Sequence, residues 1–467
     1  MNKKQLVISS LTVIVVASIT ATCARADDFE DLFSDDVFTD VDIDAGTTAA
    51  SIFSLSHVIK QQSIISYNSD KDSVLGKRYS GLTGLSLSYQ PEFQFQPNDV
   101  FSLSGEFDFT IDSIFWLRDE DWSDAVIDDR QYQFNIKELI AQARLSDWQF
   151  STGVQRVALG MADILSVSNQ LYAQNLSQPG LNDIDDTWQP AWTTMVSGSL
   201  AGVRVKAGTV HAHQLMAVPS AGSDFDTGIT TMLEQAGLDY ETEPLALKNM
   251  GWFGSVSGVL GPVDWQINAI SQLSHSPVVA MTLLTSPAPM MMPRAVVYPR
   301  ENTLAVAASY LTGPVLWKTE AAYMDGGQAL SKSLALVDYS LLAGTFGLDY
   351  NPAGFGRFVA ELQLHHVLDY GALDIADADN ALTEDAAQWA LMYSQSFLRE
   401  QLDISAQMIA FDFDASGGAM QGISAEYAWN DKWLSGIKLV NFISGDSAFL
   451  RDAGNRDRLV LTLRYQF

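Results

Sequence analysis

The chain has 467 residues and a formal net charge of −29, with 56 acidic and 27 basic residues and a single cysteine. This charge argues against nucleic-acid binding, which requires a basic face. One cysteine cannot form an internal bridge, so a disulfide-stabilised secreted domain is excluded as well.

Residues 1–26 have the layout of a secretory signal peptide. Lys3 and Lys4 precede the apolar run LVISSLTVIVVASIT, and Ala24-Arg25-Ala26 forms a small-x-small cleavage site. The run is short for a membrane-spanning helix. Cleavage after Ala26 removes the only cysteine and three positive charges, which takes the net charge from −29 to −32.

The next segment, 27–48, is strongly acidic, with nine Asp or Glu residues in its first 18 positions. This composition is typical of a disordered tail, which we place in the periplasm. Phe29, Leu32, Phe33 and Val37 follow helical spacing, which favours a second interpretation. In that interpretation a short amphipathic helix plugs a barrel mouth or docks on a partner.

From residue 49 to 467 the chain alternates between apolar and polar residues, as in VFSLSGEFDFT and RLVLTLRYQF. A period of two predicts β-strands. We expect eighteen of them, at 51–60, 80–95, 99–111, 132–145, 148–157, 193–200, 202–213, 250–260, 263–275, 302–311, 314–323, 338–350, 355–369, 386–397, 401–411, 420–429, 433–443 and 458–467. The patterns at 193–200 and 250–260 are the weakest, and losing or merging them leaves sixteen.

Very short turns, such as Ser146-Asp147 and Ala201-Gly202, alternate with long acidic loops. Tryptophans recur just after the short turns, as Trp148, Trp317 and Trp433 do. Both features are typical of an outer-membrane barrel with periplasmic turns, external loops and aromatic girdles. The sequence therefore predicts an all-β fold: a transmembrane antiparallel up-and-down barrel in the outer membrane of a Gram-negative bacterium, surrounded by lipid and lipopolysaccharide.

The polar faces of these strands carry charged residues in mid-strand, which are costly in a dry core and cheap in a wet lumen. By strand parity we predict that the pore is lined by Glu106, Asp108, Arg144, Arg204, Lys206, Lys318, Glu320, Arg357, Glu361, Lys438 and Arg464. Most of the basic members lie near the short turns. They predict a positive collar that favours an anionic solute.

The long connection 158–192 contains many apolar residues, which is unusual for a loop surrounded by water. We expect it to pack against the inner wall and narrow the lumen; the alternative is packing on neighbouring loops above the membrane. Its candidate constriction residues are Asp163, Asn169, Tyr172, Asp183, Asp185 and Asp186.

The C-terminal strand ends in Tyr465-Gln466-Phe467. A terminal aromatic on an alternating strand resembles the signal that the barrel-assembly machinery reads. We therefore predict that Tyr465 and Phe467 act as an assembly signal and that this strand closes against the one near 51–60.

The stretch STGVQRVALGMADILSVSNQL resembles the alginate-export-type porins and their uncharacterised outer-membrane relatives. The matching residues are Gly153, Gln155, Arg156, Gly160 and Asp163. The relatives typically carry an aromatic and an acidic residue beside this glycine, where the chain has Leu159 and Met161. The resemblance implies a solute or polymer channel, and for some relatives a periplasmic or inner-membrane exporter as partner.

No nucleophile elbow, zinc signature or phosphate-binding loop is present, so the sequence indicates neither an enzyme nor a metal or cofactor site. The predicted function is an outer-membrane channel for passage or export of a hydrophilic or amphipathic solute, anionic solutes included. The alternative is a non-conducting barrel that serves as a receptor or assembly partner. An outer-membrane enzyme is the least supported of the three.

Overall fold

The computed structural model describes residues 52–68, 79–118, 122–181, 187–226, 228–238, 240–284, 290–375, 382–447, 450–451 and 453–467. The predicted signal peptide and the acidic segment 27–48 lie outside the described residues. So do Asp183, Asp185 and Asp186 of the predicted constriction loop.

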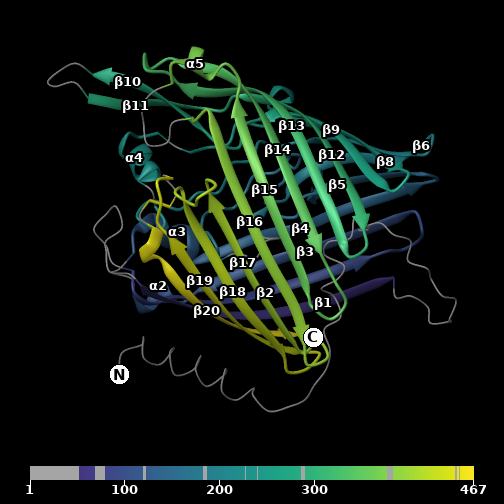
Figure 1. Ribbon diagram of the computed structural model, residues 1–467. Coiled ribbons are helices and arrows are strands. Elements are labelled where there is room, and N and C mark those ends of the chain that lie inside the picture. Colours follow the sequence, from purple (N-terminus) through teal and green to yellow (C-terminus); the bar gives the residue numbers. More distant parts are fainter. Residues whose placement is uncertain are drawn as a thin grey trace, which may run out of the picture.

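Eighteen antiparallel strands form one sheet that closes into a barrel (Figure 1). In chain order they are β1 (Phe53–Asn68), β2 (Gly81–Phe95), β3 (Phe101–Asp112), β4 (Tyr132–Leu145), β5 (Trp148–Gln155), β6 (Ala191–Leu200), β7 (Val203–Val210), β8 (Gly251–Leu260), β9 (Val263–Leu273), β12 (Arg300–Thr312), β13 (Val315–Leu330), β14 (Leu336–Tyr350), β15 (Arg357–Val367), β16 (Asp385–Phe397), β17 (Leu402–Phe411), β18 (Gly418–Ala428), β19 (Trp433–Ile443) and β20 (Asp457–Gln466).

Each barrel strand pairs with the next along the chain, and β20 pairs with β1 to close the ring. At the closing seam Lys60 lies opposite Arg464, and Ser63 lies opposite Leu461. Closure pairs the backbone groups of every barrel strand, which the interior of a bilayer requires. The predicted eighteen-stranded barrel is confirmed, including the two strands with the weakest patterns.

The connections contain a few short elements outside the barrel. β10 (Val278–Leu284) and β11 (Met290–Val297) form a separate hairpin, which the sequence pattern did not predict because Pro293 interrupts it at a register shift. The helices are α2 (Ile114–Leu117), α3 (Asp124–Arg130), α4 (Ile229–Gln235), α5 (Tyr370–Leu373), η3 (Leu247–Asn249) and η4 (Ala453–Asn455). In the described part of the chain, no helix has the length and apolar character needed to cross a membrane.

The two ends of the barrel differ in the length of their connections. At one end short turns of two to six residues join the strands, as between β6 and β7, where Ala201 and Gly202 have φ of 52° and 85°. Positive φ at both central residues matches the twist of antiparallel strands. The long connections lie at the other end (Figure 1). By analogy with bacterial barrels, the short-turn end is periplasmic and the long-loop end external.

The outer face of the barrel is apolar, as exposed Leu304, Val306 and Phe346 illustrate. Aromatic side chains flank this belt at both ends: Trp433 and Tyr465 pack with ring centroids 4.6 Å apart near the short turns, while others lie near the long loops. Large apolar groups fully exposed to water would be unfavourable, whereas a bilayer accommodates such a belt with its girdles. The chain is an outer-membrane β-barrel.

Candidate functional site

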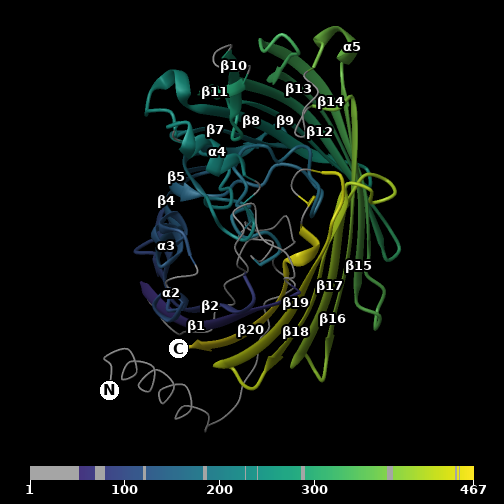
Figure 2. The same cartoon turned by 90° about the vertical axis from the view of Figure 1, so that its left-hand side faces the viewer.

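The described part of the β5–β6 loop (residues 156–181 and 187–190) folds into the lumen and lies against the inner wall. Figure 2 shows the ring of strands with segments of connecting chain inside it. Hydrogen bonds join the loop to β9, β13, β14 and β15. On the wall side, each of these hydrogen bonds is made by a side chain on the buried face of its strand. On β13 the buried residues alternate with exposed residues such as Trp317 and Tyr323.

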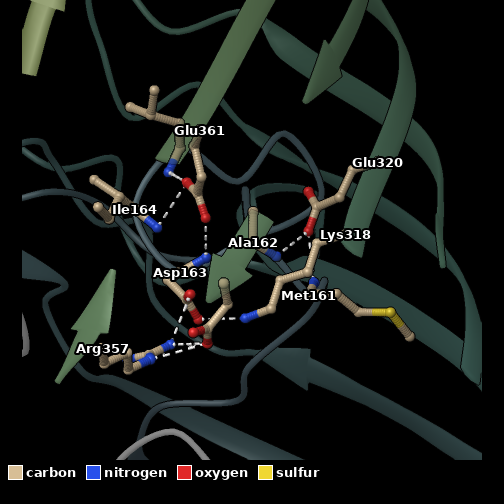
Figure 3. Close-up of polar contacts among 10 residues, drawn as sticks. Met161, Ala162, Asp163, Ile164, Lys318, Glu320, Arg357 and Glu361 are labelled. Atoms are coloured by element: carbon tan, nitrogen blue, oxygen red, sulfur yellow. Dashed lines mark hydrogen bonds and ion pairs between the residues drawn. The ribbon is translucent and has the colours of Figure 1, made fainter. Parts of the chain in front are cut away.

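Glu320 of β13 is the first of two wall carboxylates that bind the loop backbone (Figure 3). Only 3% of its surface is exposed. Its donors are the backbone N–H groups of Met161 (2.5 Å), Ala162 (2.8 Å), Val167 (3.0 Å) and Ser168 (3.0 Å), and the Ser166 hydroxyl (2.8 Å). Hydrogen bonds to an ionised group are stronger than those between neutral groups. Glu320 therefore holds the loop at two points, residues 161–162 and residues 166–168.

Glu361 of β15 is the second wall carboxylate and is also 3% exposed. Its Oε1 accepts the N–H of Asp163 at 2.6 Å, and its Oε2 accepts those of Ile164 and Leu165 at 3.0 and 2.6 Å (Figure 3). Three consecutive N–H groups that converge on one anion form a backbone nest. The loop therefore presents two adjacent nests, and the wall supplies one carboxylate to each.

Asp163 reverses this polarity, because here the loop supplies the anion and the wall the cations. Its carboxylate lies 2.7 Å from Nζ of Lys318 and 3.0 Å from Nη2 of Arg357. Arg357 also binds Asp349 at 2.6 Å. The Asp163 and Lys318 side chains are both more than nine-tenths buried. A buried ion pair is costly to break on one side only, so this group specifies one position of the loop.

Gly160 lies where the loop first meets the wall. Its N–H donates to Oε1 of Gln266 at 2.8 Å, and its φ is 110°. A Cβ at this position would lie 2.6 Å from Oε1 of Glu320 and 2.7 Å from Oγ of Ser166. Glycine is therefore required here both by the backbone conformation and by the close approach of Glu320.

The described part of the β7–β8 loop (residues 211–226, 228–238 and 240–250) also crosses the lumen. Phe225 packs in a cluster with Val440 and Phe442 of β19. Eight strands separate β8 from β19 in either direction around the ring, so the loop reaches the wall opposite its own roots. The two inner loops contact each other through the parallel bridge between Asn175 and Ala217.

Four residues predicted to line the pore, Lys318, Glu320, Arg357 and Glu361, are covered by the β5–β6 loop instead of facing open water. Their side chains lie on the inner face of β13 and β15, and strand parity alone could not show what covers that face. Arg357 is thereby removed from the predicted positive collar, since Asp349 and Asp163 neutralise it.

The other predicted lumen residues lie apart from the contacts between the β5–β6 loop and the wall. Glu106 lies 3.8 Å from Lys137, and Asp108 accepts hydrogen bonds from Gln90 and Thr110. The inward faces of β4, β7, β19 and β20 carry Arg144, Arg204, Lys206, Lys438 and Arg464.

The remaining predicted loop residues make local contacts. Asn169 donates its N–H to Ser166, and the Tyr172 hydroxyl accepts the N–H of Val157 at 3.0 Å. Lys60, directly opposite Arg464 on the inner face, was not predicted; the alternation of β1 would have indicated it.

No group of three or more His, Cys, Asp or Glu side chains within the described ranges fits a metal ion.

No protein-family model matches the chain, and no curated protein matches it. The chain is similar in structure to solved outer-membrane proteins at low identity. OpdK of Pseudomonas aeruginosa, solved with vanillate, is 10% identical with a TM-score of 0.48, over 89% of this chain and 98% of that one. OccK2 (OpdF) of the same organism, solved with glucuronate, is 12% identical with a TM-score of 0.47, over 89% and 96%. OmpT of Vibrio cholerae is 10% identical with a TM-score of 0.40, over 90% and 99%.

Proposed function

We propose that the protein is an outer-membrane channel whose lumen is narrowed by the β5–β6 loop. The observation that carries this proposal is the double seat formed by Glu320 and Glu361. A loop held by two buried carboxylates and a buried ion pair keeps one position, and a fixed constriction is what a selective pore needs.

The solute class we propose is hydrophilic or amphipathic and anionic. Arg144, Arg204 and Arg464 face inward near the short turns and are exposed. Exposed cations in a low-dielectric ring raise the local concentration of anions. The resemblance to alginate-export-type porins at residues 151–171 supports passage of a solute or polymer, and export is the direction it suggests.

Single-channel recording in a planar bilayer tests the channel. We expect stepwise conductance and a reversal potential that favours anions in a salt gradient. A barrel that shows heat-modifiable migration, and is therefore folded, but stays silent would contradict the proposal.

The second candidate is a non-conducting barrel that serves as a receptor or assembly partner. One observation favours it: two loops, not one, cross the lumen and meet each other. The recording separates the two functions. A variant without residues 214–248 adds a control, because it should conduct if the β7–β8 loop alone closes the barrel.

A further inference from the structure

The tip of the β7–β8 loop carries a buried carboxylate, Asp224, between two arginines. Nη2 of Arg458, on β20, donates to its Oδ2. Nη1 of Arg130, at the end of α3, lies 3.9 Å from its Oδ1. The exposed fractions of the Arg458, Asp224 and Arg130 side chains are 1%, 9% and 12%. The three groups come from three segments that meet only when the loop crosses the lumen.

Neighbouring contacts hold the same tip in place. Oγ of Ser123 donates to the carbonyl of Ala221 at 2.7 Å, and the Tyr79 hydroxyl donates to the carbonyl of Gly222. Phe225 packs against Phe442, with ring centroids 5.4 Å apart. The Arg458 guanidinium lies 5.2 Å from the centroid of the Phe225 ring. The ion pair is thus the charged centre of a closed contact between the loop and the opposite wall.

This centre has unused hydrogen-bonding capacity. Among the described residues, Oδ1 of Asp224 and Nε of Arg130 are buried without a hydrogen-bond partner. In the described part of the chain, Arg130 donates one hydrogen bond, 3.4 Å long, from Nη2 to the carbonyl of Ser177, and its charge also acts on the carboxylate of Asp112. Arg458 and Arg130 therefore both contact Asp224, and of these two contacts the one from Arg458 is a hydrogen bond, while Arg130 lies 3.9 Å away. A buried guanidinium group is best satisfied by a carboxylate that accepts two parallel hydrogen bonds from its N–H groups.

The neighbouring carboxylate Asp226 does not supply the missing anion. Its oxygens accept the N–H groups of Gly222 and Gly228, both at 2.8 Å, and the hydroxyl of Thr231 at 2.6 Å. These bonds shape the loop tip itself and leave Asp226 engaged there.

We propose that Arg130 and Arg458 form a binding site for a carboxylate solute at the external mouth, that Asp224 occupies this site in the closed barrel, and that a free carboxylate displaces Asp224 and releases the β7–β8 loop. The proposal rests on the proposed channel function and adds its opening step. The chemical class follows from the occupant already present, because Asp224 ends in an acetate-like group.

Asp224 remains ionised in this setting. Burial alone would raise its pKa, but the positive charges of Arg458, Arg130 and Arg456 outweigh that effect and hold the pKa below its ordinary value. The internal competitor is therefore an anion over the physiological pH range, like the solute that would replace it.

Calorimetric titration of the detergent-solubilised full chain with acetate, and with neutral acetamide, tests the site. Asp224→Ala removes the tethered competitor, whose effective concentration is high, so we expect acetate to bind about tenfold or more tightly than to the wild type. Arg458→Gln should lose this binding, and acetamide should not bind. Equal acetate affinity of the wild type and Asp224→Ala, or equal binding of acetamide, would overturn the proposal.

Two controls keep this titration interpretable. Asp374→Ala removes an exposed external carboxylate that pairs with Lys332, and it should bind acetate as the wild type does. Heat-modifiable migration reports folding, and Asp224→Asn, which keeps the shape of the side chain, replaces Asp224→Ala if that variant does not fold. The titration measures acetate binding and not conductance. A failure of the carboxylate site is therefore distinguishable from a failure of the channel function.

A disulfide lock tests the release of the loop. The predicted mature chain has no cysteine, so Ser123→Cys with Ala221→Cys introduces a single pair at two residues that are in contact in the closed state, where Oγ of Ser123 donates to the backbone carbonyl of Ala221. We expect acetate to make the β7–β8 loop at least several-fold more sensitive to protease in the reduced form only. Equal sensitivity with and without acetate in the reduced form would overturn the displacement step.

Discussion

Asp163 and Lys318 are joined by a 2.7 Å ion pair although 155 residues separate them in the chain. One belongs to a loop and the other to the barrel wall, so the pair couples the position of the loop to the inner face of β13. Glu320, two residues further along the same strand, repeats the coupling through the loop backbone.

Loss of charge at Glu361 should loosen the loop. Glu361→Gln keeps the size of the side chain but replaces one acceptor oxygen with an NH₂ group that faces the loop N–H groups. Hydrogen bonds to charged groups contribute about 1.5–3 kcal/mol each, so we expect the seat to lose roughly 2–4 kcal/mol. Single-channel records should show higher mean conductance and more noise. Glu92→Gln, an exposed residue of β2, is the matched control; equal records for both variants would contradict the role of the seat.

Removing the charge of Asp163 should change ion selectivity. Asp163→Asn leaves Lys318 and Arg357 with one anion fewer where the β5–β6 loop meets the wall, and breaking a buried pair on one side costs about 3–5 kcal/mol. We expect the reversal potential in a salt gradient to shift toward anions. In the double variant Asp163→Asn with Lys318→Met most of this shift should disappear. Additive effects of the two substitutions would show that the residues act independently.

Two histidines at the external rim should make the loop region sensitive to mild acid. Burial lowers the pKa of both His213 and His275 below the usual value of 6.5. Nδ1 of His213 accepts a hydrogen bond from the N–H of Glu243, and Nε2 of His275 accepts one from the side-chain amide of Gln272. A ring nitrogen that accepts a hydrogen bond carries no proton, so both rings are neutral in this arrangement.

The direction of this pH effect follows from the number of protons that each form binds. As pH falls through 6.5, the unfolded or opened region binds protons that the closed region does not, so the closed form loses stability. Hydrogen exchange of residues 211–217 should be faster at pH 5.5 than at pH 7.5 after correction for intrinsic rates. The difference should shrink in His213→Phe, while an unchanged difference in that variant would assign the effect to other groups.

The last residue of the barrel is expected to matter for assembly and not for transport. The ring of Phe467 stacks on His57 and Tyr465, with centroids 5.0 and 5.4 Å away, and its backbone exchanges two 3.0 Å hydrogen bonds with His57. Deleting Phe467 should lower the amount of folded barrel in the outer membrane severalfold and leave the conductance of assembled molecules unchanged. Phe467→Tyr should restore assembly. Altered conductance with normal assembly would contradict this role.

Alternation of side chains was sufficient to predict the barrel, because each strand has one face toward lipid and one toward the lumen. Where the alternation lapses, the predicted bounds are short. β1 continues past Gln61 and Gln62 to Asn68, and β13 continues to Leu330 through a bulge at Gly326. Gly326 reads as a turn residue in sequence, yet its φ of 89° serves the bulge, where a Cβ would lie 2.3 Å from the carbonyl of Arg300.

The loop seat was only partly predictable. The apolar residues of 158–192 indicated a loop that packs inward, and parity placed Glu320 and Glu361 on the inner wall. Their partners, however, are backbone N–H groups up to 198 residues away, and every residue except proline carries such a group. Backbone donors leave no trace in a pattern of side chains, so the pairing of each carboxylate with its nest required the fold. The same holds for Asp224 and Arg458, which 234 residues separate.

The seat of the β5–β6 loop also constrains the order of folding. The loop is synthesised before every strand that holds it, since Gln266, Glu320 and Glu361 all follow it in the chain. Until β15 has joined the sheet, the nests at residues 161–168 have no carboxylates to bind, and their N–H groups must stay solvated. The interior of the barrel therefore takes its final shape late in folding, although the loop that fills it is synthesised early.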